Sequence, residues 1–427
     1  MRFQALPAIL LSSAAIALMA PAARAETYEV KPGEDWSALS PKLKPGDEVV
    51  LLEGTHVAAA FEGLAGEPGK PIVFRSKDIR SLVQITPDRE GVKLVDCRHI
   101  RLERFAIRNA RRAGIVVEGT EPGRSSDIAV RDVYVLGTSG LSEQAGILVS
   151  RTDRFDLRRS RFENCVGAAV HLESVEGVAA EMLQLRASLP VRAQFGLLVV
   201  GDCRELDFND VWIAGEFDVG ISLGAKDAVS RRTRERTVAD VPAPASVRPE
   251  KEPVKEPAKE PGQEPAASKP ETDSDDPAKS PRVRAASFAQ CMIRGVRTAL
   301  ELGSCELLAI RNCSIVEPTS EVFVLVRPPK ERTALQASFR ENVVVWRAGS
   351  ISRFAAIVAG TDASGLRLGP NIWWSEELPS ALPLLGPEPQ HFPGTLEVPQ
   401  TIDMDPDLDA RGRILKPEAR MFGRNVG

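Results

Sequence analysis

Aromatic side chains are scarce in this sequence of 427 residues, where they make up 5% and include only two tyrosines. That is sparse for a protein that would grip sugars over its whole surface. The formal net charge is only -4, which argues against nucleic-acid binding as the main role, since that role needs a strongly basic surface. Six cysteines are too few to form a disulfide framework in so long a chain, and no Cys-x-x-Cys pair indicates zinc.

Long hydrophobic runs are also missing. No stretch of the mature chain reaches the roughly 18 apolar residues that cross a bilayer, so no membrane span is expected. The apolar run Leu6–Ala20 follows a basic tip and precedes Ala23-Arg24-Ala25, the small-x-small pattern that a signal peptidase cleaves. We therefore predict a signal peptide over residues 1–25 and a secreted or periplasmic protein.

Internal periodicity is the strongest feature that is present. A short apolar-x-apolar strand, a two-residue bend and a second such strand recur between residues 100 and 374, with a step of 22 to 30 residues. A third strand, often opened by glycine, follows at a looser distance. Strands this short must stack on copies of themselves to bury their apolar sides. The sequence predicts an all-β fold, a single-stranded right-handed parallel β-helix of about nine coils with a short N-terminal capping helix.

The inward residues of each coil follow from this repeat. First strands are predicted to point these pairs inward: Ile100/Leu102, Ile128/Val130, Phe155/Leu157, Ala180/Met182, Leu206/Phe208, Ala286/Phe288, Leu308/Ile310 and Leu366/Leu368. In the coil of Ala180, the second strand is predicted to point Leu185 and Ala187 inward. His171 is predicted to project outward from a third strand among Val116, Leu148 and Leu198. That outward column either packs under a covering segment or forms a partner surface.

One segment interrupts the repeat. Residues 226–284 are rich in proline, glutamate and lysine and cannot bury enough apolar surface to fold, so we predict a disordered insertion. If these residues are left out, the distance in sequence between the coils on either side equals the usual step of the repeat. The predicted organisation is one domain, with an N-terminal cap and first coils over 26–92, coils over 93–225 and 285–374, and a closing segment over 375–427.

Residues 28–78 contain three features in this order: a predicted short helix, the segment PGDEVVLLEGTH and the segment GKPIVFRS. In this they resemble the opening segment of the pectin-lyase-like right-handed parallel β-helix superfamily, nearest to its alginate lyase and chondroitinase B branch. The resemblance implies a helix over 36–43, capped by Asp35, that plugs the first coil. It carries over no catalytic residue, because the branch's lysine–arginine pair and Arg-His-Gly segment have no counterpart here.

Outward residues of the first strands form one predicted column: Arg101, Ala129, Asp156, Glu181, Asp207, Ser287 and Ala309. Asp156, Glu181 and Asp207 would repel one another at successive strand spacings, so something must neutralise them. Calcium is one solution, since it takes several oxygen ligands, and Arg158 in the bend is another. The column is a cation site, an acid/base pair for glycan cleavage, or a solvated face with salt bridges.

Outward residues of the second strands form another predicted column: Ala106, Tyr134, Arg161, Arg186, Trp212 and Met292. Arginines bind carboxylates or sulfates in a fork while rings stack on sugar faces, so Tyr134, Arg161, Arg186 and Trp212 are candidates for binding an acidic sugar chain. The alternative is rings covered by a loop, with arginines stacked on them. For a lyase, Tyr134 and Arg161 are the candidate catalytic pair, because no lysine lies between Lys93 and Lys226.

Cys291 and Cys313 are predicted to lie one above the other in consecutive coils, about 4.8 Å apart, either as a disulfide bond or as stacked thiols. Taken together, the sequence predicts a secreted protein that binds an acidic polysaccharide, with cleavage left open and calcium as the one cofactor considered. The alternative is a non-catalytic cell-envelope or surface interaction module.

Overall fold

The computed structural model describes residues 25–78, 83–87, 89–138, 144–225, 282–326, 335–347, 350–351, 353–357, 365–375, 401–402, 406–409, 413–420 and 422–423. Residues 1–24 of the predicted signal peptide and 226–281 of the predicted insertion lie outside the described residues. In the described ranges, no helix is long and apolar enough to cross a membrane.

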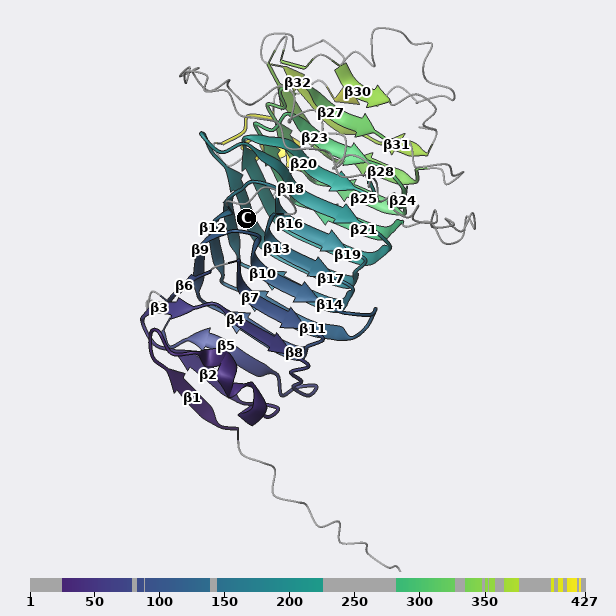
Figure 1. Cartoon of the computed structure of the whole chain (residues 1–427). Coiled ribbons are helices and arrows are strands. Elements are labelled where there is room, and N and C mark those ends of the chain that lie inside the picture. Colours follow the sequence, from purple (N-terminus) through teal and green to yellow (C-terminus); the bar gives the residue numbers. More distant parts are fainter. Residues whose placement is uncertain are drawn as a thin grey trace, which may run out of the picture.

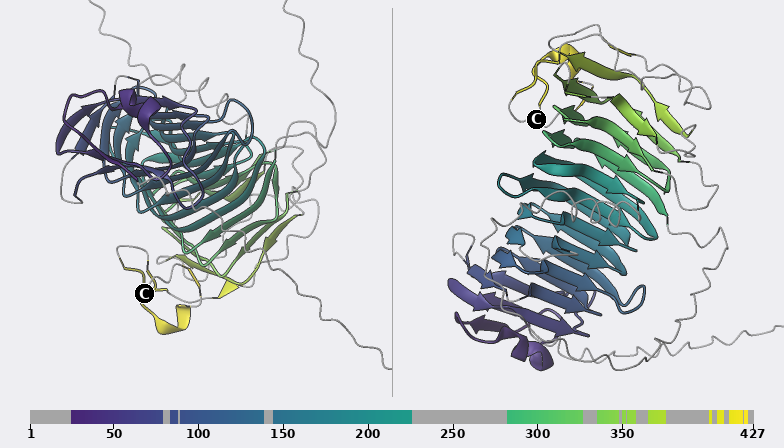
Figure 2. Two further views of the ribbon diagram at one scale, coloured as in Figure 1. Left: turned by 90° about the horizontal axis from the view of Figure 1, so that it is seen from below. Right: turned by 45° about the horizontal axis from the view of Figure 1, so that its top comes forward.

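Parallel pairing between successive coils builds the molecule. Within the described residues, the strands form one sheet of 23 strands and one of 10. The chain visits three strand columns in turn and returns one coil further along, which makes a parallel β-helix (Figure 1). Crossovers between parallel strands take the right-handed sense. The predicted fold is confirmed, and both views of Figure 2 show the rungs stacked in chain order.

The larger sheet, sheet A, holds two of the three columns, and β17 (Glu176–Ala187) and β19 (Cys203–Gly215) run through both. The first column contains β1 (Thr27–Val30), β2 (Glu48–Leu51), β5 (Ile72–Ser76), β8 (Arg98–Glu103), β11 (Ser125–Arg131), β14 (Thr152–Arg158), β21 (Val283–Ala289), β24 (Cys305–Glu306), β25 (Leu308–Arg311), β28 (Ala337–Arg340) and β31 (Leu366–Leu368). The second column contains β3 (Gly54–Val57), β6 (Val83–Thr86), β9 (Ala106–Ala110), β12 (Tyr134–Thr138), β15 (Arg161–Cys165), β22 (Met292–Arg294), β26 (Ser314–Val316), β29 (Val343–Trp346), β32 (Asn371–Ser375) and β33 (Thr401–Ile402).

The smaller sheet, sheet B, is the third column. Its strands are β4 (Ala59–Glu62), β7 (Glu90–Val95), β10 (Ala113–Glu118), β13 (Ala145–Ser150), β16 (Ala168–Glu173), β18 (Ala193–Val200), β20 (Phe217–Leu223), β23 (Thr298–Leu302), β27 (Glu321–Leu325) and β30 (Arg353–Ile357). Glycine lets this sheet approach sheet A closely: a Cβ at Gly114 would lie 2.6 Å from Val135 Cγ1. The glycines noted in the third strands therefore set the spacing of the two sheets.

A short helix closes the first coil, as predicted. The 3-10 helix η1 (Trp36–Lys42) has Asp35 as its N-cap, whose side chain accepts a hydrogen bond from Ser37 N. Trp36 is fully buried and meets Phe61 and Phe74 edge-on, with ring centroids 5.5 and 5.6 Å apart. The helix thereby covers the apolar end of the stack, where open strands would otherwise face water.

The coil of Ala180 departs from the predicted register. In the first-column part of β17, Val178 and Ala180 are in register with the inward-facing residues of β14 and β19. In its second-column part, the inward-facing residues are Leu183 and Leu185. Met182, predicted to point inward, instead occupies the bend with a φ of 55° and an exposed fraction of 40%. The prediction for this coil was therefore wrong by two residues, which changes both outward columns described below.

The coil stack continues across the insertion. Strand β21 pairs in parallel with β19, beginning with Cys203 opposite Val283. Phe208 and Phe288 stack flat on each other, with centroids 4.7 Å apart and planes at 2°. Residues 282–284 thus belong to the β-helix, and the predicted insertion boundary at residue 284 lay three residues too far along the chain.

The described part of the closing segment lies along the side of the stack. Ile414, Ala419 and Phe422 pack on Val343 and Ile372, which face outward from β29 and β32. The 3-10 helix η4 (Pro417–Ala419) belongs to this segment. The closing segment therefore covers the outer face of the second column near the C-terminal end of sheet A.

Candidate functional site

The first-strand column holds two carboxylates that do not touch. Asp156 pairs in register with Ala179, which in turn pairs with Asp207, so an alanine rung separates them. Glu181 lies two positions further along the strand and pairs with Arg158 and Asn209. The predicted run of three successive carboxylates was wrong, because it depended on the misplaced register of β17.

Arginine neutralises this part of the surface. Asp156 accepts hydrogen bonds from Arg131 at 2.6 Å and from Arg158 at 2.5 Å. Arg158 also approaches Glu181 at 3.3 Å, and Asp207 accepts a hydrogen bond from Ser287 at 2.6 Å. Within the described ranges, no group of three His, Cys, Asp or Glu side chains is placed to hold a metal ion. The salt-bridged face, one of the three alternatives, describes these residues best.

The second-strand column is also changed by the register. Its outward residues are Ala106, Tyr134, Arg161, Gln184, Trp212 and Met292. Gln184 takes the position predicted for Arg186, and Arg186 stands one outward position further along β17, opposite Glu163 and Ala214. The predicted neighbouring pair of Arg161 and Arg186 in one column was therefore wrong.

Tyr134 and Arg161 both engage Glu163. The Tyr134 hydroxyl donates to one carboxylate oxygen at 2.6 Å, while Arg161 Nε donates to the other at 2.8 Å and its guanidinium lies 5.5 Å from the Tyr134 ring. Burial alone would raise the pKa of Glu163, but these hydrogen bonds and the charge of Arg161 hold it below its ordinary value. The three side chains form one closed polar network.

This network makes Tyr134 a poor catalytic base. Burial, the hydrogen bond to Glu163 and the charge of Glu163 together raise the pKa of Tyr134 to about 12. A base that abstracts a proton near neutral pH needs a pKa close to the working pH. The geometry therefore does not favour the proposed catalytic pair of Tyr134 and Arg161.

A small hollow lies beside the network. Its volume is about 160 Å³, and its lining includes Arg161, Gln184, Arg186 and Trp212. Arg186 is exposed and has no hydrogen bond or ion pair with any residue that the structure describes. Trp212 is half-buried, and its Nε1 has no hydrogen-bond partner among the described residues. Three of the four predicted binding residues thus meet here.

A larger hollow lies on the outer face of sheet B. Its volume is about 590 Å³, and it spans β10, β13, β16 and β18, which is a length of about 14 Å at one strand spacing per coil. We call it the sheet B groove. The register places Leu148, His171 and Leu198 directly beside one another along its floor. This confirms the predicted outward column, in which a histidine stands between two leucines.

Charged side chains flank the groove in ion pairs that bridge coils. Arg151 donates to Glu118 at 2.9 Å, and Arg112 donates to Glu90 at 3.1 Å. Glu173 lies on the same strand as His171, is exposed, and takes part in no ion pair among the described residues. Cations and carboxylates are therefore balanced around the groove, which carries no strong charge of one sign.

Two polar atoms in the groove lack hydrogen-bond partners. His171 Nε2 and Gln144 Oε1 are both shielded from solvent and make no hydrogen bond in the described structure. Burial lowers the pKa of His171 to about 4, so its ring is neutral at physiological pH. An unsatisfied buried polar group costs about 1–3 kcal/mol. A ligand hydroxyl could remove that cost, because it can both donate and accept.

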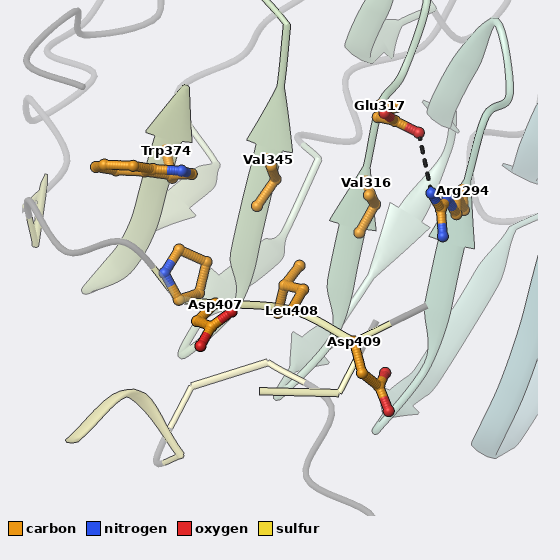
Figure 3. A pocket seen from close by; sticks show the side chains of 9 residues that line it. Arg294, Val316, Glu317, Val345, Trp374, Asp407, Leu408 and Asp409 are labelled. Atoms are coloured by element: carbon orange, nitrogen blue, oxygen red, sulfur yellow. Dashed lines mark hydrogen bonds and ion pairs between the residues drawn. The ribbon is translucent and has the colours of Figure 1, made fainter. Parts of the chain in front are cut away.

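A third hollow, of about 370 Å³, lies near the C-terminal end of sheet A. Figure 3 shows Val316, Val345 and Trp374 on successive strands, with the closing segment Asp407–Asp409 facing them. At one side Arg294 is paired with Glu317 at 3.3 Å. The closing segment thus occupies the continuation of the same outer face that carries Arg186 and Trp212.

The cysteines all lie within the described ranges and are buried thiols. Ser314 N donates to Cys291 O at 2.9 Å, which places Cys291 and Cys313 in consecutive coils as predicted. Their sulfurs lie 3.3 and 3.2 Å from the carbonyl oxygens of Ala289 and Arg311. The structure therefore has stacked thiols here, the second of the two alternatives, and not a disulfide bond.

The sequence interpretation missed the groove while placing its floor correctly. A lone histidine on an apolar face was interpreted as packed, and Arg112, Gln144 and Arg151 gave no signal because they lie at strand ends or in turns. One observation could have indicated the site: His171 is the one polar side chain between Val116 and Leu198 in the predicted outward column.

No protein-family model matches the chain, and no curated protein is similar to it in sequence. Three solved structures have similar stacked strands. An alginate lyase from a Paenibacillus species is 9% identical, with a TM-score of 0.43 over 80% of this chain and 97% of that one. Pectate lyase Pel9A is 12% identical, with a TM-score of 0.39 over 80% and 79%. A GH136 lacto-N-biosidase from Eubacterium ramulus is 12% identical, with a TM-score of 0.45 over 88% and 65%. These values concern the fold and support no statement about activity.

Proposed function

We propose that this protein binds a polysaccharide in the sheet B groove. The observation that carries the proposal is the combination of an aliphatic floor with unsatisfied polar atoms. Leu148 and Leu198, both largely buried, line the groove on either side of His171, and His171 Nε2 and Gln144 Oε1 lack hydrogen-bond partners among the described residues. A sugar presents C–H faces and hydroxyl groups together, so it matches both.

The volume of the groove suits a ligand the size of a short oligosaccharide segment. A volume of about 590 Å³ over four strands lies within the range of about 300–1,000 Å³ that is usual for ligand pockets. The predicted export of the protein agrees with this proposal, because polysaccharides are abundant outside the cytoplasm.

Binding and cleavage are separate parts of the proposal. Cleavage would depend on the exposed carboxylate of Glu173, two residues from His171 on β16, because burial lowers the pKa of His171 to about 4 and makes it a weak base. Residues two apart on a strand point to the same side. If the protein binds a polysaccharide and releases no cleavage product, the alternative of a non-catalytic surface module is supported. The binding site would then be the same.

Isothermal titration of the mature chain with soluble polysaccharides, chosen from a glycan array, tests the binding. His171→Phe and Gln144→Ala should each weaken binding about tenfold, which corresponds to about 1.4 kcal/mol. Gln336→Ala is the control, since Gln336 is exposed just before β28, away from the groove. Equal affinity in all four proteins would refute the groove as the binding site.

Cleavage has its own measurement. Incubation with alginate, chondroitin and pectin, followed by ultraviolet absorbance, detects the unsaturated ends that elimination produces. A product that forms in the wild type and is lost in Glu173→Gln would establish catalysis at the groove.

A further inference from the structure

We propose that the outer face of the second column of sheet A, from β9 to β22, is a separate binding site for an anionic polysaccharide. The proposal starts from a column of outward residues in register: Arg108, Leu136, Glu163, Arg186, Ala214 and Arg294. We call this face the arginine face. It lies on sheet A, and the sheet B groove is not part of it.

The spacing of the arginines suits an extended chain. Arg108 and Arg186 are three rungs apart, and Arg186 and Arg294 are two rungs apart. At about 4.8 Å per rung, these separations are about 14 and 10 Å. A polymer with a carboxylate or sulfate on each repeating unit can meet arginines placed at such intervals along one line.

The charge on this face is not cancelled. Neither Arg108 nor Arg186 forms an ion pair within the described part of the chain. Arg161 is held by Glu163, and Glu317 is shared by Arg294 and Arg347. The charge of Arg186 also lowers the pKa of Glu163, but that carboxylate is already paired with Arg161. Two cations therefore remain for an anionic ligand, and the exposed Arg186 is the better placed of them.

Trp212 adds an apolar surface at the centre of the face. The hollow of about 160 Å³ is lined by both Trp212 and Arg186. A sugar ring could lie against the indole while its acidic group forms a bidentate contact with the guanidinium of Arg186. The unpartnered Nε1 of Trp212 is a further donor for a ligand oxygen.

The closing segment limits the site at one end. Leu408 and its neighbours Asp407 and Asp409 face Val316, Val345 and Trp374 across the third hollow (Figure 3). The open part of the arginine face therefore ends at Arg294, and a bound chain would extend from there toward Arg108. This restricts the site to the rungs between β9 and β22.

Affinity electrophoresis and isothermal titration with alginate, polygalacturonate and heparin test the proposal, with dextran as the neutral comparison. The wild type should bind at least one polyanion, more weakly as sodium chloride rises, since exposed charge pairs are screened by salt. Arg186→Gln and Trp212→Ala should each reduce affinity about tenfold, and Arg186→Gln should also flatten the salt dependence.

Matched controls separate this site from overall charge and from the groove. Arg204→Gln makes the same charge change at an exposed position, where the arginine pairs with Asp202 at 2.8 Å, and it should leave binding unchanged. His171→Phe should leave the salt-dependent component of polyanion binding intact, since that component is assigned to the arginine face. No binding of any polyanion, or equal losses in Arg204→Gln and Arg186→Gln, would overturn the proposal. Thermal melts establish that each variant is folded.

Discussion

The Tyr134 hydroxyl donates a 2.6 Å hydrogen bond to Glu163, a residue of the next coil. This contact joins two rungs of the arginine face and fixes the protonation of both groups. Tyr134 remains neutral because its pKa is raised to about 12, while Glu163 remains ionised because its pKa is lowered. The pair stabilises the stack and is not arranged for proton transfer.

The first prediction concerns this pair. The sequence has two tyrosines, Tyr28 and Tyr134, so Tyr28→Phe leaves one phenol to follow by its ultraviolet absorbance. At pH 11, only about a tenth of Tyr134 should be ionised, as a pKa about one unit higher requires. Adding Glu163→Gln removes the acceptor's charge and should lower the pKa. Half-ionisation of Tyr134 near pH 10 in the folded Tyr28→Phe protein would contradict the structure.

The same pKa shift of Tyr134 makes the stability of the folded protein depend on pH. The pKa of Tyr134 is higher in the folded state than the ordinary value of 10.0, so the folded state binds this proton more tightly. The stabilisation is complete below pH 10 and is lost as pH rises from 10 to about 12. Tyr134→Phe should cost about 1 kcal/mol of the free energy of unfolding at pH 7, the usual value for one hydrogen bond.

The second prediction concerns Asp156 and calcium. Because Arg131 and Arg158 already satisfy this carboxylate, addition of calcium or EDTA should leave the melting temperature unchanged. Asp156→Asn should lower stability by about 1 kcal/mol, since it removes the negative charge that pairs with two arginines. A calcium-dependent rise in the melting temperature that disappears in Asp156→Asn would restore the cation-site hypothesis.

The third prediction concerns the cysteines. Burial raises the pKa of Cys97 and Cys203 to about 11 and that of Cys165 and Cys305 to about 12. The thiolate is the reactive form, so the native protein should react slowly with a thiol reagent at pH 8. In denaturant without reductant, six thiols per chain should react, the number in the sequence. A count of four, with both missing thiols restored by reductant, would instead support the Cys291–Cys313 disulfide.

The sequence was sufficient to predict the fold because each coil repeats the same inward pairs, such as Ile128/Val130 and Phe155/Leu157, and these pair in register as expected. It failed at β17 for a physical reason. The bend there is made by Met182 with a positive φ, at the position that the polar residues Arg159 and Asp210 take in the adjacent coils. Because methionine is usually a core residue, the prediction extended the inward–outward alternation through the bend. It therefore assigned Glu181 and Arg186 to the wrong outward columns.

The groove could not be predicted in the same way. The repeat shows which residues face outward, and it placed His171 beside Leu148 and Leu198. It does not show that Gln144 and Arg151, from the ends of a strand, converge on that floor. That convergence depends on the path of the turns, which have no fixed length from coil to coil.

The last prediction follows the protonation of His171. Burial holds its folded-state pKa at about 4, below the ordinary value of 6.5, so the folded state binds this proton less tightly than the unfolded state. The stabilisation is complete above pH 6.5 and is lost as pH falls toward 4. At pH 4 and below, the loss should be on the order of 3 kcal/mol, from a pKa difference of about 2.5 at about 1.4 kcal/mol per unit.

Chemical denaturation of the wild type and His171→Gln from pH 7.5 to pH 4 measures the effect, and the difference between the two isolates this group from the other titrating residues. The wild type should lose more stability over this interval than the variant. Nuclear magnetic resonance provides a second readout, because the imidazole signal that is missing in His171→Gln should not shift between pH 7.5 and 5.5. Since the ring is neutral throughout that range, it should bind a sugar hydroxyl equally well at both values, and polysaccharide binding in the groove should not vary with pH there. A midpoint near pH 6.5 for that signal would mean that water reaches the ring freely, and the groove would then lack the shielded, unsatisfied nitrogen on which the binding proposal depends.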